Sequence, residues 1–222
     1  MINKKGALTQ KQIIGIVILI ISFVVILAFL LMLNLKGEID IEACRNSVSM
    51  RQIPFGEYVI SLKCKTKEVC FSMGGDCEEV DETISIGNKE ELMGKISNLF
   101  VDCWWMMGEG KVDYGSSGSC AICNKIFFNM GSETLTYDEL YNYMANNKIS
   151  DKSMSYLFYL YKVNNVGSIP NKKSGNIDFN EEYVVITKIQ DKGNHLPPDL
   201  VKFSSKNLGS EGLDCSKYVV EV

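Results

Sequence analysis

The pattern of hydrophobic and polar positions separates one uniformly apolar segment near the N-terminus from a long remainder with helix and strand periodicities. Residues 13–33 contain no charged side chain, and 17 of these 21 residues are Ile, Leu, Val or Phe. As a helix the segment would be about 31 Å long, close to the roughly 30 Å hydrocarbon core of a bilayer. A soluble helix keeps a polar face, whereas this one has only Ser22. The pattern therefore predicts a transmembrane anchor over residues 13–33.

The flanks of this segment predict how it is processed and oriented. A cleaved secretory signal usually has an apolar run of about 7–15 residues that ends at a small-x-small site. Here the run is longer and no Ala-x-Ala follows it, so we expect an uncleaved signal anchor. Lys4, Lys5 and Lys11 precede the run, and acidic residues follow it. The positive-inside rule then predicts a cytoplasmic stub over residues 1–12 and a single-pass protein of the cell membrane with its C-terminal domain outside.

The remainder of the chain has the composition of a globular domain. We expect residues 34–52 to continue the anchor as a juxtamembrane stalk, and residues 53–222 to form an extracytoplasmic domain. With the three N-terminal lysines set aside, 20 Lys and Arg stand against 27 Asp and Glu, so this part carries a net charge of about −7. Nucleic-acid binding usually needs a clustered positive charge, so we expect no nucleic-acid partner.

The clearest helix of the domain begins at Asn88. Glu91 stands three residues later, as in a capping box, and the residues that follow are apolar at helical spacing. The periodic positions are Leu92, Ile96, Leu99, Cys103 and Met106. Gly108 and Gly110 are expected to end the helix.

Trp104 and Trp105 are adjacent at the end of this helix, so their side chains must pack against different surfaces. Adjacent residues point in different directions from a helix, so the two indoles cannot share one face. If one belongs to the core, the other needs a second surface. That surface is the membrane interface, a partner, or a second packing layer.

The other periodic segments predict an α+β fold with a mostly antiparallel sheet. A second helix is expected to begin at Thr136, capped through Glu139. Strands are expected at residues 57–64 with a hairpin partner at 67–71, and at 119–128, 183–189 and 218–222. Residues 156–161 fit either a strand or a helix, and a strand is the preferred interpretation. Residues 164–180 and 191–214 are expected to be loops, with Pro197 and Pro198 forming an extended break.

The cysteines predict a disulfide framework. There are eight, all beyond the anchor: Cys44, Cys64, Cys70, Cys77, Cys103, Cys120, Cys123 and Cys215. An even number on the oxidising side of a membrane is typical of structural disulfides. Eight cysteines allow roughly a hundred pairings, so the sequence leaves the connectivity open.

Zinc binding and thiol redox chemistry are the alternatives for Cys120 and Cys123, which form a Cys-x-x-Cys motif. The motif is half of a common zinc spacing, but there is no second Cys-x-x-Cys, and His195 is the only histidine. Redox motifs lie at a helix N-terminus, whereas this one lies in a β-favouring run. Residues i and i+3 of a strand lie about 10 Å apart on opposite faces, beyond the roughly 7 Å limit for a disulfide. We therefore expect the two to pair with different partners.

Other catalytic signals are weak. Glu109 and Asp113 flank a turn and could form a carboxylate pair, although acids in turns are usually solvated. His195 falls in a predicted loop, and one isolated histidine gives no Ser-His-Asp arrangement. The sequence thus yields no catalytic, cofactor-binding or metal-binding residue, and we expect no cofactor and no enzymatic activity.

Two stretches resemble known families. The region from Asp102 to Asp113, with the Cys-x-x-Cys that follows, resembles uncharacterised single-pass membrane proteins of DPANN-type archaea, a resemblance that covers about residues 1–130 and implies no particular activity. Lys4-Lys5-Gly6-Ala7 before the apolar run resembles the class III signal of archaeal type IV pilin-like proteins. That resemblance implies cleavage after Gly6 and packing of the apolar helix into a filament. The family commonly has Glu where this chain has Lys11.

The sequence therefore predicts a membrane-anchored binding or structural domain of the cell envelope. Its expected partners are the lipid bilayer, through residues 13–33, and either an envelope protein or further copies of itself. The first alternative is a pilin-like filament subunit processed after Gly6, and the second is a thiol-redox or zinc-binding domain.

Overall fold

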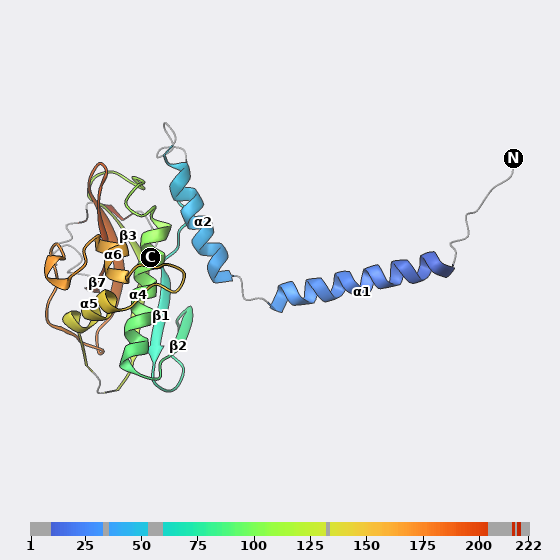
Figure 1. The fold of residues 1–222 in the computed structure, drawn as a ribbon, viewed down its shortest axis with the longest axis horizontal. Helices are drawn as coiled ribbons and strands as arrows, with labels where there is room; N and C mark the ends of the chain where they lie inside the picture. The colour runs from blue at the N-terminus through green and yellow to red at the C-terminus, as the bar shows by residue number, and fades with distance from the viewer. Residues whose placement is uncertain are drawn as a thin grey trace. The chain divides into compact units, whose positions relative to one another are not determined.

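The computed structural model describes residues 10–32, 36–52, 60–131, 134–203, 215 and 217–218. The chain divides into two units, Met1–Ile39 and Asp40–Val222, and the second is called the domain below. Figure 1 shows the ribbon of each unit, with labels on the larger elements.

The first unit contains helix α1 (Gln10–Met32), so the helix expected over residues 13–33 is present. Its side chains are described for residues 13–26, where the large apolar ones are all exposed, from 48% at Ile16 and Val17 to 68% at Leu19. Within the described residues, no helix has both the length and the apolar character required to cross a membrane. The transmembrane placement of residues 13–33 therefore stays a prediction.

Helix α2 (Lys36–Met50) takes up most of the predicted stalk, residues 34–52. From Asp40 onward the chain belongs to the domain. Cys44 and Val48 are fully buried there, and Cys44 is joined to Cys64 by a disulfide. Residues 40–52 are therefore part of the folded domain.

The domain contains a mixed sheet in the order β2-β1-β3-β6-β7. Its strands are β1 (Lys67–Ser72), β2 (Glu82–Ser85), β3 (Ser119–Asn129), β6 (Tyr183–Asp191) and β7 (Asn194–Lys202), and β8 (Lys217–Tyr218) pairs with β3 off this path. The pairs β1–β2, β1–β3 and β3–β8 are parallel, whereas β3–β6 and β6–β7 are antiparallel. The α+β class is confirmed, and the sheet is mixed where we expected an antiparallel one.

The predicted hairpin of residues 57–64 with 67–71 is wrong. Residues 60–64 are not a strand, and residues 57–59 lie outside the described residues. β1 instead pairs in parallel with β2, although only residues 73–81 connect the two. Parallel neighbours usually need a crossover of a dozen or more residues. Here the disulfide Cys70–Cys77 ties the short connection back to β1.

Helices α4 (Lys89–Met106), α5 (Tyr137–Asn146) and α6 (Tyr156–Tyr161) build the main core with one face of the sheet. Leu92, Ile96, Cys103 and Met106 of α4 are buried, as the helical period predicts. The predicted Leu99 is only partly buried, and Phe100, which the predicted stripe did not include, is fully buried. The smaller elements are β4 (Leu135–Thr136), β5 (Asn176–Ile177) and the 3₁₀ helix η1 (Val166–Ser168). Alternate strand residues point to the other face, where Cys120, Ile122 and Val184 form a second, smaller cluster.

Two further expectations are wrong for local reasons. Residues 156–161 are helix α6 because Ser155 caps the segment: its hydroxyl accepts a hydrogen bond from the Phe158 backbone N–H at 3.2 Å. The predicted loop after residue 191 contains strand β7. This strand tolerates Pro197 and Pro198 because it is at the edge of the sheet, and because the two prolines occupy an irregularity in its register with β6. The predicted strand 218–222 is described only at residue 218, in β8.

Candidate functional site

Helix α4 supplies one wall of each of two hollows on the described part of the domain. The predicted cap is present, since the Asn88 side chain accepts a hydrogen bond from the Glu91 backbone N–H at 2.9 Å. The Glu91 carboxylate in turn accepts from the Gly87 backbone N–H at 2.9 Å. The apolar stripe of α4 faces the main core, which leaves a more polar side of the same helix to border the hollows.

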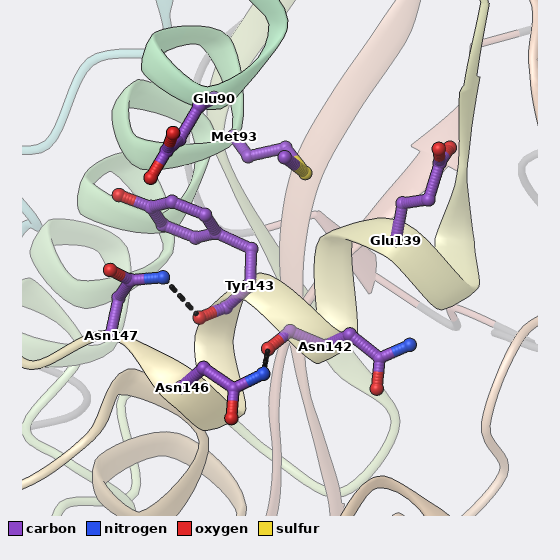
Figure 2. A pocket seen from close by; sticks show the side chains of 7 residues that line it. All are labelled: Glu90, Met93, Glu139, Asn142, Tyr143, Asn146 and Asn147. Carbon is purple, nitrogen blue, oxygen red and sulfur yellow. Dashed lines mark hydrogen bonds between the residues drawn. The ribbon is translucent and has the colours of Figure 1, made fainter.

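The first hollow has a volume of about 340 Å³ and lies between α4 and α5 (Figure 2). It is lined by Glu90, Met93, Glu139, Asn142, Tyr143, Asn146 and Asn147. Asn146 and Asn147 each donate through the side-chain amide to a backbone carbonyl of α5, at 3.0 Å. Figure 2 shows their Oδ1 atoms pointing away from these bonds. The first hollow is therefore rich in hydrogen-bond acceptors around one aromatic ring.

Tyr143 is the aromatic member of the first hollow. In Figure 2 its hydroxyl lies beside the Glu90 carboxylate. Burial and the nearby charge of Glu90 raise the pKa of Tyr143, so this hydroxyl keeps its proton and can donate. Gly94 makes room for it, because a Cβ there would lie 2.8 Å from the Tyr143 hydroxyl oxygen.

The second hollow has a volume of about 470 Å³ and lies further along α4. It is lined by Asn98, Val101, Asp102 and Trp105 of α4 and by Ile149, Ser150, Asp151 and Lys152 of the segment after α5. Burial raises the pKa of Asp102 to about 6, although the positive charge of Lys67 opposes the shift. Within the described part of the chain, the Asp102 carboxylate has no hydrogen-bond or ion-pair partner.

A pair of tyrosines contacts residues of both hollows. The rings of Tyr143 and Tyr156 are 6.3 Å apart between centroids. The Tyr156 hydroxyl donates to Asn98 Oδ1 at 2.7 Å, which orients the Asn98 amide at the border of the second hollow. Both hollows therefore border α4, the first near its N-terminal end and the second near its C-terminal end.

The two adjacent tryptophans use different surfaces of the domain. Trp104 is buried in the main core, with 5% of its surface exposed. Trp105 is half-buried, and the Arg45 guanidinium of α2 stacks on its ring at 4.2 Å and donates to its carbonyl oxygen. The second surface is thus a further packing layer within the chain, the last of the three possibilities that the sequence leaves open.

Glu109, beside the second hollow, is held by several hydrogen bonds and ion pairs within the fold. It accepts hydrogen bonds from the Tyr159 hydroxyl at 2.6 Å and from Lys111 at 3.0 Å, and the Arg45 guanidinium lies 3.8 Å away. Burial alone would raise its pKa, but these bonds and the positive charges of Lys111 and Arg45 leave the pKa of Glu109 lowered. The carboxylate is therefore ionised and engaged within the fold.

Asp113 and His195, far apart in sequence, form a buried contact. His195 Nε2 lies 2.7 Å from Asp113 Oδ1, which also accepts from the Gly193 backbone N–H at 3.0 Å. The His195 side chain is only 1% exposed. The contact ties the β6–β7 turn to the segment that follows α4, and Asp113 thus pairs with His195 and not with Glu109. Sequence analysis missed it because β7 was expected to be a loop.

All eight predicted cysteines form disulfides: Cys44–Cys64, Cys70–Cys77, Cys103–Cys123 and Cys120–Cys215. Cys120 and Cys123 point to opposite faces of β3 and have different partners, as the strand geometry predicts. All eight sulfurs are paired, and Cys120 and Cys123 are joined to different cysteines and not to each other. In the ranges that the structure describes, no three His, Cys, Asp or Glu side chains are grouped to hold a metal ion.

Comparison of the chain with models of protein families, with curated proteins and with solved structures finds no match. The candidate site is therefore defined by the geometry of the two hollows along α4.

Proposed function

We propose that this chain is a single-pass membrane protein whose disulfide-bonded domain lies outside the cytoplasm and serves the cell envelope in binding or in structure. The observation that carries the proposal is the pairing of all eight cysteines within the domain. Disulfides of this number form and persist in oxidising compartments and are rare in the cytosol.

Helix α1 supplies the second argument. Its described apolar side chains point outward all round, with exposed fractions near one half or more. Exposed apolar surface of this extent calls for a cover that the helix does not provide for itself. A lipid bilayer is the cover that matches an uncharged run of 21 residues. The proposal assigns no catalytic role to the domain.

Extraction of membranes with alkaline carbonate tests the proposal. We expect the full chain to stay in the membrane pellet and to be released by detergent. We also expect thiol alkylation of the unreduced protein to add no label, with all eight cysteines labelled after reduction. Release into the supernatant, or labelling before reduction, would contradict the proposal.

A second candidate is a pilin-like filament subunit, and the exposed surface of α1 favours it too. The same apolar side chains could be covered by α1 helices of other copies in a filament core. Intact-mass analysis of the membrane-extracted protein separates the two candidates. A mature chain that starts at Ala7 supports the filament subunit, whereas a retained Met1 or Ile2 supports the simple anchor.

A further inference from the structure

Positively charged side chains from separate segments of the domain gather around the Glu109 carboxylate. Arg45 of α2 lies 3.8 Å from Glu109 Oε2, and Lys111 of the turn after α4 lies 3.0 Å from the same oxygen. The other oxygen, Oε1, accepts a hydrogen bond from the Tyr159 hydroxyl of α6 at 2.6 Å. This bond joins the Tyr159 ring to the charged group.

Two further ammonium groups lie over the Tyr159 ring. Lys152 Nζ is 3.6 Å from the ring centroid, and Lys162 Nζ is 5.3 Å from it. Lys162 also donates to the Tyr159 carbonyl oxygen at 2.8 Å. The four cations, called the cationic cluster below, are Arg45, Lys111, Lys152 and Lys162.

The cationic cluster holds more positive charge than its surroundings neutralise. Its four positive charges gather around the single carboxylate of Glu109 and the neutral ring of Tyr159. Asp102 and Asp151 border the second hollow together with Lys152, but no ion pair joins either of them to Lys152 among the described residues. This local excess is found in a domain whose net charge is about −7.

Lys152 is the member of the cluster that is left to meet a ligand. The other three donate to Glu109, to the Trp105 carbonyl or to the Tyr159 carbonyl, whereas no hydrogen bond or ion pair of the Lys152 ammonium group is described. Burial lowers the pKa of Lys152. The charge of Glu109 opposes this shift, and the positive charges of Lys162, Arg45 and Lys111 add to it. An anion beside Lys152 would offset this repulsion.

We propose that the cationic cluster binds a phosphate group. A phosphate group carries about one to two negative charges near neutral pH and has several acceptor oxygens, so it can meet more than one of these cations at once. Lysine ammonium groups bind phosphate as point charges. A soluble phosphate ion and the head group of a phospholipid share this chemistry.

Titration calorimetry on the purified full chain, in a polyoxyethylene detergent and a phosphate-free buffer, tests the proposal. The probes are inorganic phosphate, glycerophosphoglycerol as a head-group diester, and sodium acetate at the same ionic strength. We expect at least one of the two phosphates to bind and acetate not to bind. Tighter binding of inorganic phosphate would support a soluble ion as the ligand, and tighter binding of the diester would support a lipid head group. Absence of binding by both at millimolar concentration, or equal binding of acetate, would overturn the proposal.

Charge-matched variants locate the binding. Lys152→Gln and Lys162→Gln should each weaken phosphate binding by about tenfold, whereas Lys152→Arg keeps the charge and should keep most of the affinity. Lys65→Gln and Lys95→Gln are the controls, because each removes one positive charge from an exposed lysine outside the cluster. Equal weakening by the cluster and control variants would overturn the proposal.

Thermal unfolding separates a lost site from a damaged fold. A ligand that binds only the folded state raises the melting temperature. The phosphate that binds should therefore raise the melting temperature of the wild type and of Lys95→Gln, and should raise that of Lys152→Gln much less. An equal rise in all three proteins would overturn the proposal. The inference does not rest on the proposed function, because purified protein reports phosphate binding wherever the chain resides in the cell.

Discussion

The first unit and the domain place apolar residues in opposite ways. Between Ile13 and Ile26 the large apolar side chains of α1 are 48–68% exposed, whereas Leu92, Ile96 and Phe100 of α4 are 0% exposed. The first unit has no cysteine, and the domain has all eight. The domain thus covers and crosslinks its own core, whereas the described apolar side chains of α1 are exposed. In the proposed function, a lipid bilayer covers them. Their stabilities should therefore respond to different changes.

The largest effect should come from charges in α1. Ile20→Arg combined with Val24→Arg places two guanidinium groups near the middle of the segment, each costing about 2.5–3.5 kcal/mol in membrane insertion. We expect this variant to leave the carbonate-resistant pellet while the thermal unfolding of the domain stays unchanged.

Ser153→Arg with Asn164→Arg is the matched control, because both residues are exposed in the domain. The control should remain in the pellet. Equal behaviour of the two double variants would show that α1 is not the attachment.

The next effect concerns the longest crosslink, Cys120–Cys215, which spans 95 residues. Cys120→Ser with Cys215→Ser should lower the free energy of unfolding by about 4 kcal/mol in the chain-entropy account. Unfolding by denaturant measures this change in the free energy of unfolding. The single variant Cys215→Ser should expose one thiol, that of Cys120, and loosen the chain beyond residue 191, as hydrogen exchange would detect. Unchanged stability of the double variant would contradict this role.

A cavity in the main core should lower the free energy of unfolding slightly less than loss of the Cys120–Cys215 disulfide does. Phe100→Ala removes a fully buried ring from α4, and such changes cost about 3–4 kcal/mol. The loss should appear as a lower denaturant midpoint of the domain, with membrane attachment retained. A parallel loss of attachment would show that the two units are not independent.

The ionisation of Asp102 should make the stability of the domain depend on pH. Its pKa in the fold is raised from 3.8 to about 6, so the folded state holds a proton that the unfolded state releases. The contribution of protonated Asp102 to the free energy of unfolding is fully present below about pH 4. It is lost as the pH rises to about 6.

Asp102→Asn should remove this loss of stability, because the amide does not ionise. We expect the free energy of unfolding at pH 7.5 to rise by about 1–2 kcal/mol, with no gain at pH 4. Melting curves of wild type and variant across this range give the difference. If the variant is more stable by the same amount at every pH, the gain comes from better packing of the amide and not from removing the ionisation of Asp102.

The smallest effect should come from the cap of α4. Asn88→Ala removes the acceptor for the Glu91 backbone N–H and should cost about 1 kcal/mol. Thr136→Ala at the capping box of α5 provides a comparison of the same kind. Unchanged unfolding in both variants would show that neither cap contributes to stability.

Sequence patterns were sufficient where the physical signal is local. The caps at Asn88 and Thr136, the buried stripe of α4 and the opposite directions of Cys120 and Cys123 all follow from spacing along the chain. Helix α6 was missed because six aromatic and aliphatic residues carry no decisive period, and its Ser155 cap was not weighed.

Long-range features could not be obtained in this way. The prolines of β7 argue against a strand until its position at the sheet edge is known. The parallel pairing of β1 and β2, the disulfide partners and the Asp113–His195 contact depend on which segments meet in space. The two hollows also join residues from α4 with residues some 50 positions later, so no local motif marks them.

The central claim is that the domain lies outside a membrane that α1 crosses, and lysine labelling tests it most directly. Intact cells are treated with a membrane-impermeant amine reagent, and labelled sites are mapped by mass spectrometry. The account predicts label on the exposed Lys95 and Lys148 of the domain, with Lys4, Lys5 and Lys11 labelled only after lysis. Label on the N-terminal lysines of intact cells, or protection of Lys95 and Lys148 until lysis, would contradict it.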